Sequence, residues 1–245
     1  MHITFRENSR YLVIAALLPL LMGCGFWRPT VGPTQAETQI AANGASSAQV
    51  ELTLGAGELQ LSALQTSAGS SDLAEVAFTY SIASWQPTVD YNVNQGVGNL
   101  VIAQPKTTAV LPQNIRYEWD VKLNQAIPLD LKLDMGAGKA VLDLRGLTLT
   151  AVDIGAGAGE LQMDLSGAWA QSATITIKGG VGKVTLHLPK AVGVHIEATA
   201  GLGRVNADGL RKEGDAYVNA AYATSAVVLT ITVEAGVGEV NLTME

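Results

Sequence analysis

The chain has 245 residues, of which 48% are hydrophobic and only 15% are charged, and its formal net charge is −7. This apolar content is enough for a sizeable core and argues against intrinsic disorder, while the acidic balance argues against binding nucleic acid by charge. The 26 glycines, with few aromatic residues, favour strands and tight corners over amphipathic helices.

Residues 1–23 are predicted to be a signal peptide. Arg6 and Arg10 give a basic start, and residues 11–22 form an apolar run that is too short to span a bilayer. Removing these 23 residues leaves 13 basic and 21 acidic side chains, so the remaining surface stays acidic.

The end of the apolar run resembles the lipobox of bacterial lipoproteins, in which cleavage precedes a cysteine that receives the lipid. Its four residues are Leu21, Met22, Gly23 and Cys24, and Cys24 is the only cysteine of the chain. We therefore expect a lipid anchor on Cys24 and an extracytoplasmic position at the cell membrane or envelope. The alternatives are an ordinary cleaved signal peptide with a chance cysteine, and an uncleaved membrane helix.

Residues 24–48 are rich in Pro, Thr, Gln, Ala, Gly and Ser. This composition predicts a flexible linker without secondary structure, which would hold the folded part away from the membrane.

A Gly-x-Gly pair followed by a polar residue and apolar alternation occurs seven times, which is the dominant feature of the sequence. The intervals between first glycines are 41, 40, 21, 23, 21 and 35 residues. The paired glycines are Gly55 and Gly57, Gly96 and Gly98, Gly136 and Gly138, Gly157 and Gly159, Gly180 and Gly182, Gly201 and Gly203, and Gly236 and Gly238.

The residues around each pair alternate with a period of two, as in Leu161, Met163 and Leu165. This pattern predicts a strand with one buried face before and after each pair. Glycine suits the corner because a residue without a Cβ tolerates positive φ and close backbone approach. We therefore predict an all-β, right-handed, single-stranded β-solenoid, with an up-and-down barrel or a sandwich as the alternative.

Several further segments together carry a family resemblance, and they are residues 119–123, 128–131, 136–138, 142–144, Leu188-Pro189, Gly193-Val194 and the later Gly-x-Gly copies. Through them the sequence resembles the toastrack family of bacterial surface domains, which is related to the C-terminal domain of LiaF-type cell-envelope stress proteins. The resemblance covers roughly residues 49–245, and it implies an N-terminal toastrack part over 49–130 and a C-terminal LiaF-like solenoid over 131–245. It also implies an adhesin or a stress-signalling module without a catalytic role.

No residue pattern predicts a catalytic, metal or cofactor site. The glycine pairs do not open helices as nucleotide-binding loops do, and Lys183 stands where a calcium-binding repeat would need an acidic ligand. The charged residues after the pairs, such as Lys139, Glu160 and Lys183, are interpreted as a surface ladder of opposite charges, with paired catalytic acids as the alternative.

Tyr80 and Trp85 lie in a region with few repeat constraints and are a possible binding patch for glycan or protein, the alternative being that they pad the end of the solenoid. The sequence thus predicts a non-enzymatic lipoprotein for adhesion, scaffolding or sensing, with the membrane, an envelope protein or cell-wall glycan as partners. An accessory of a membrane stress sensor and a solenoid carbohydrate-active enzyme are the alternative functions.

Overall fold

The structure is a computed structural model that describes residues 33–65, 71–106 and 116–245. The described residues belong to one compact unit, and their regular secondary structure is almost entirely strand. The elements are β1 (Thr34–Ala41), β2 (Ser47–Leu64), β3 (Asp72–Tyr80), the 3₁₀ turn η1 (Ala83–Trp85), β4 (Thr88–Asn94), β5 (Val97–Ala103), β6 (Tyr117–Asn124), β7 (Leu129–Asp143), β8 (Leu149–Asp164), β9 (Ala173–Leu188), β10 (Gly193–Asp208), β11 (Arg211–Glu213), β12 (Ala216–Val218) and β13 (Val228–Met244).

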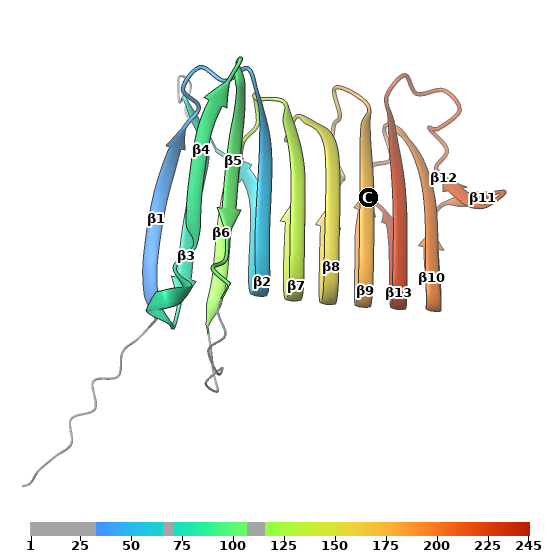
Figure 1. Cartoon of the computed structure of the whole chain (residues 1–245). Helices are drawn as coiled ribbons and strands as arrows, with labels where there is room; N and C mark the ends of the chain where they lie inside the picture. Colours follow the sequence, from blue (N-terminus) through green and yellow to red (C-terminus); the bar gives the residue numbers. More distant parts are fainter. Residues whose placement is uncertain (1–32, 66–70, 107–115) are drawn as a thin grey trace, which may run out of the picture. The chain divides into compact units, whose positions relative to one another are not determined.

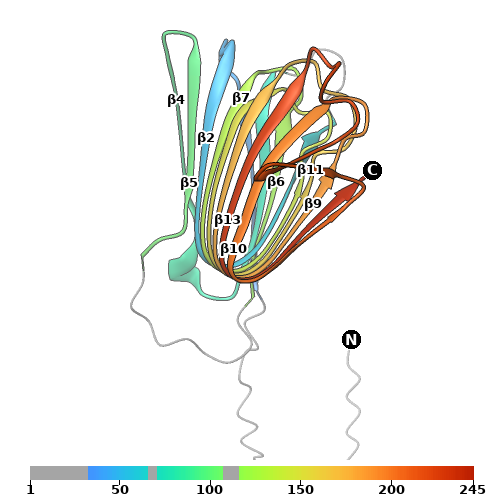
Figure 2. The ribbon, with the colours of Figure 1, turned by 90° about the vertical axis from the view of Figure 1, so that its right-hand side faces the viewer.

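Six of these strands are long, and each bends in its middle into two arms (Figure 2). In β7 the buried side chains stand at Leu131, Leu133 and Met135 before the glycine pair, and at Ala140 and Leu142 after it. The buried positions change parity across the bend, so both arms turn their apolar face towards the same core. One hydrophobic cluster fills the space between the arms, which explains the period-two pattern of the sequence.

The long strands stack in parallel and in register in the order β2, β7, β8, β9, β13, β10 (Figure 1). Gly159, for example, pairs with Gly138 on one side and with Gly182 on the other. The all-β solenoid prediction is confirmed, because the long strands stack as an open parallel sheet. Short turns carry the chain from the second arm of β7 to the first arm of β8, and from the second arm of β8 to the first arm of β9. The last strand breaks the chain order, since β13 lies between β9 and β10.

The rung before β2 is divided between two strands. β5 pairs with the first arm of β2 and β6 pairs with its second arm, both in parallel. Beyond them β4 pairs with β5, β3 with β6 and β1 with β3, all antiparallel. The prediction of one continuous single-stranded ribbon therefore does not extend to the N-terminal part.

Two expectations about this part need correction. Gly96 and Gly98 do not form a corner, because Gln95 and Gly96 have positive φ and make the tight hairpin turn between β4 and β5. The linker prediction for 24–48 is wrong over residues 34–41, which form β1. This strand was missed because it is an edge strand with a single buried side chain, so it lacks apolar alternation.

The turns after the long strands and the end of the stack close the core. A buried amide holds the C-terminal end together: the Asn219 side chain accepts a hydrogen bond from the Val194 N–H at 3.0 Å and donates to the carbonyls of Pro189 and Val192.

None of the described segments forms a helix with the length and apolarity that crossing a bilayer requires.

The bends stack so closely that their glycine positions leave no room for a side chain. Gly159 has a φ of +136°, and a Cβ on it would lie 1.9 Å from the carbonyl oxygen of Gly138. A Cβ on Gly182 would lie 1.8 Å from the carbonyl oxygen of Gly159. Since these neighbours are backbone atoms on both sides, the rungs would have to separate to admit a side chain.

We predict that Gly159→Ala destabilises the protein by more than about 4 kcal/mol or prevents folding, because alanine cannot enter this stack. The control is Gly167→Ala, which also has positive φ but whose Cβ would meet nothing closer than 3.9 Å. This control should cost only about 1 kcal/mol of backbone strain. The measurement is the free energy of unfolding by chemical denaturation, and equal losses for the two variants would contradict the account.

Candidate functional site

The second glycine of each bend is followed by a charged side chain, and these six side chains form a row along the outside of the bends. In strand order they are Glu58, Lys139, Glu160, Lys183, Glu239 and Arg204, and each is directly opposite the next. The signs alternate along the whole row. We call this row the charge ladder.

Two of the opposite-charge pairs in the charge ladder make direct contacts between their side chains. Lys139 Nζ lies 3.8 Å from a carboxylate oxygen of Glu160, and Arg204 Nε lies 2.9 Å from Glu239 Oε1. Asn206 also donates a hydrogen bond to Glu239. The hydrogen bond from Arg204, with the nearby charge of Lys183, lowers the pKa of Glu239 below its usual value.

The crossed position of β13 completes this alternation. If the strands followed the chain order, Lys183 on β9 would face Arg204 on β10, and two cations would be neighbours. The observed order inserts Glu239 between them. Like charges directly opposite each other on neighbouring strands are destabilising, so the ladder favours the observed order.

A row of apolar side chains runs beside the charge ladder at the middle residue of each bend. Over β2, β7 and β8 this residue is alanine, but on β9, β13 and β10 it is Val181, Val237 and Leu202, which are 57%, 43% and 72% exposed. The exposed apolar surface therefore grows towards the C-terminal end of the stack.

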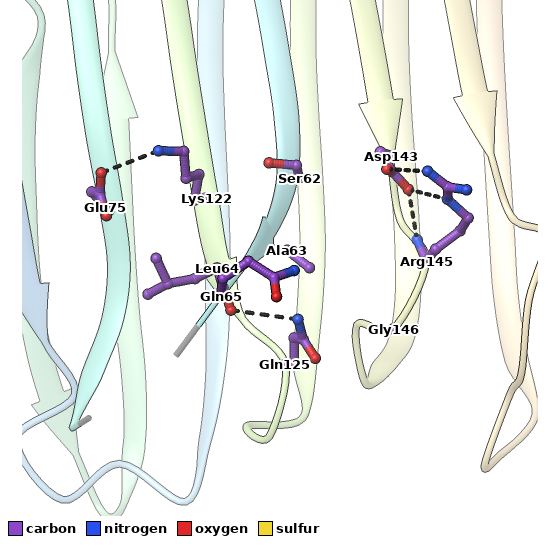
Figure 3. A pocket seen from close by; sticks show the side chains of 10 residues that line it. All are labelled: Ser62, Ala63, Leu64, Gln65, Glu75, Lys122, Gln125, Asp143, Arg145 and Gly146. Atoms are coloured by element: carbon purple, nitrogen blue, oxygen red, sulfur yellow. Dashed lines mark hydrogen bonds and ion pairs between the residues drawn. The ribbon is translucent and has the colours of Figure 1, made fainter. Parts of the chain in front are cut away.

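A polar hollow of about 660 Å³ lies on the outer side of the second arms, around the end of β2. Figure 3 shows Ser62 between two ion pairs, which form the walls of the hollow. In one pair Lys122 Nζ lies 3.1 Å from Glu75 Oε1, and in the other Arg145 Nη2 lies 2.7 Å from Asp143 Oδ2. The hollow is open, so water reaches both pairs, and it offers hydroxyl, carboxylate and amide groups to a polar ligand.

One carboxyl group of this hollow, that of Asp143, is held in its charged form. The hydrogen bond from Arg145 is the main reason that the pKa of Asp143 lies below its usual value, so this carboxyl is ionised at neutral pH and cannot donate a proton. A glycosidase needs one carboxyl group with a raised pKa. Within the described ranges, no group of three or more His, Cys, Asp and Glu side chains is placed to hold a metal ion.

Tyr80 and Trp85, the predicted binding patch, are both only 4% exposed and belong to the core. Trp85 packs edge-on against Tyr117, whose hydroxyl donates a hydrogen bond of 2.9 Å to the Trp85 carbonyl. Burial raises the pKa of Tyr117 to about 12. Of the two interpretations of Tyr80 and Trp85, their burial agrees with padding of the solenoid end and not with an exposed binding patch, because these rings fill the N-terminal end of the core.

The remaining predicted site residues fall into two groups. Leu21, Met22, Gly23 and Cys24 lie outside the described residues. The glycines of the other six pairs lie at the bends of β2, β7, β8, β9, β10 and β13. The polar hollow was not anticipated, because its walls come from strands that are far apart in the sequence.

Comparisons with known proteins place the chain among similar folds. A family model for the N-terminal domain of toast-rack proteins matches residues 30–187, and one for the C-terminal region of LiaF, a cell wall-active antibiotics response protein, matches residues 145–242. No curated protein matches the chain.

Among solved structures, a "putative cell adhesion protein" from Clostridium sporogenes is 34% identical, with a TM-score of 0.81, over 87% of this chain and all of its own length. A "putative adhesin" from Bacteroides fragilis is 10% identical with a TM-score of 0.31, over 87% of this chain and 98% of its own. A likeness as low as the second supports no functional inference.

We predict that Glu239→Gln lowers the thermal midpoint by about 1–3 °C at pH 7, because it leaves Lys183 and Arg204 without the carboxylate between them. Since folding lowers the pKa of Glu239, its contribution is present above its usual pKa of 4.5 and is lost as the pH falls through the lowered value. The difference between the variant and the wild type should therefore shrink below about pH 4.5. Glu197→Gln, an exposed change on the first arm of β10, is the control and should leave the thermal midpoint at pH 7 unchanged.

Proposed function

The chain belongs to the toast-rack family, and from this premise we propose that it is a non-enzymatic cell-envelope protein that makes adhesive or scaffolding contacts. The observation that carries this proposal is the likeness to a protein designated a putative cell adhesion protein, whose whole length this chain covers. The proposed partners are an envelope protein or a cell-wall glycan.

The geometry supports a display role better than a catalytic one. In-register stacking makes the outer faces of the arms into repeated rows of side chains, a surface that can bind an extended partner at many points. The polar hollow beside Ser62 offers paired charges, and the carboxyl group of Asp143 in its wall is ionised and does not serve as a proton donor. A stiff rack with patterned outer rows suits binding.

We further propose that a lipid on Cys24 anchors the protein to the membrane on its extracytoplasmic side. The support is the lipobox pattern of residues 21–24 after an apolar run, and the absence of any second cysteine from the sequence. Two acyl chains would hold such a protein stably on a bilayer.

The anchor is tested by Cys24→Ser. We expect labelled fatty acid to enter the wild-type protein and not the variant, and the variant to lose the membrane retention that depends on the lipid. Ser46→Ala serves as a control that should keep its label. Label of wild-type strength in Cys24→Ser would exclude the lipobox interpretation.

The contact function is tested by crosslinking in intact cells, comparing the wild type with Gly159→Ala, which should not present the folded rack. We expect the wild type alone to be joined to cell-wall material or to another cell surface, and the purified protein to bind the same material. Turnover of cell-wall or capsule polymer by the purified protein would contradict a non-enzymatic role.

A second candidate is an accessory of a membrane stress sensor. The specific observation in its favour is the match of residues 145–242 to the C-terminal region of LiaF. The same crosslinking experiment separates the two functions, because a signalling accessory would be joined to one particular membrane protein rather than to wall material.

A further inference from the structure

β10, the long strand at the end of the stack, has an open edge. β10 pairs with β13 from Gly193 to Asp208, but on its other side β12 covers only residues 195–197. In the described part of the chain, no strand pairs with the outer edge of residues 198–208. Such an edge presents backbone N–H and C=O groups that can pair with another strand.

The second arm of β10 is complementary to itself when two copies run antiparallel. With Asn206 opposite Asn206 of the other copy, Arg204 faces Asp208 and Val205 faces Ala207, and each pair occurs twice. Arg204 and Asp208 are exposed on the outer face, while Val205 and Ala207 are only partly buried against the core. Opposite charges and apolar side chains directly across an antiparallel pair are both stabilising.

We propose that two copies of this chain associate through the second arms of β10, paired antiparallel about a two-fold axis at Asn206. The contact is isologous, so it closes as a dimer and leaves no further β10 edge free. A parallel pairing in register would instead set Arg204 against Arg204 and Asp208 against Asp208.

The other end of the stack lacks this complementarity. β1 and β4 are its edge strands, and each carries one charged residue, Glu37 and Asp90, so neither can form an ion pair with its own copy. The position of Leu202 agrees with the choice of β10. Leu202 is 72% exposed, more than any other large apolar side chain among the described residues, and it lies at the bend that borders the proposed contact.

The first test uses charge reversal on the full-length chain, solubilised in mild detergent, with mass measured by sedimentation. We expect a concentration-dependent dimer for the wild type and at least about tenfold weaker association for Asp208→Lys, in which the new lysine would face Arg204. Arg204→Glu should weaken association similarly, and an equimolar mixture of the two variants should form dimers again. A monomeric wild type, or unchanged association of Asp208→Lys, would overturn the proposal.

The second test does not depend on the stability of the charge variants. In a Cys24→Ser background, Asn206→Cys carries the only thiol, and two such thiols would meet at the axis and form a disulfide-linked dimer under mild oxidation. The control is Gln162→Cys on β8, which is in the same row of the second arms, through Thr185 and Asn241, but inside the stack. Equal crosslinking of both variants, or none at position 206, would contradict the proposed axis.

Discussion

The contact of glycine backbone on glycine backbone at the bends is the constraint on which the rest of the structure depends. At each second glycine from Gly138 onwards, a Cβ would stand between 1.7 and 1.9 Å from a carbonyl oxygen of the neighbouring rung. This approach fixes the bends in register with one another. Because each strand continues from its bend into two arms, the register of the arms is fixed as well. The aliphatic columns of the core and the rows on the outer faces are aligned for the same reason.

Charge then favours the observed choice of neighbouring strands. The glycine contacts alone would accept β10 or β13 next to β9, because both strands carry the same bend. The charge ladder distinguishes them, since only β13 offers a carboxylate, Glu239, to Lys183. Exposed pairs of this kind contribute little individually, so their value lies in the choice between two similar packings rather than in total stability.

The repeated part of the fold could be read from the sequence because its signal is local: glycine pairs and period-two alternation mark β7, β8 and β9 directly. The non-local features could not. No residue near Lys183 in the sequence indicates that its neighbour in the stack comes from β13. β1 has only one buried residue, Ile40, which is too few to produce a recognisable pattern. Gly96 has the same motif but forms a hairpin turn. Trp85, a possible surface residue by sequence, belongs to the core because Tyr117, on a strand that is distant in the sequence, packs against it.

A regular rack with patterned outer rows is suited to repeated contacts, which is the physical reason for the proposed role in adhesion or scaffolding. That role requires the bends to be in register in solution. Nuclear Overhauser contacts in glycine-labelled protein measure this most directly: the account predicts contacts from Gly182 to both Gly159 and Gly238. A contact from Gly182 to Gly203 in place of Gly238 would contradict the strand order, and the absence of contacts between bend glycines would contradict the stacking.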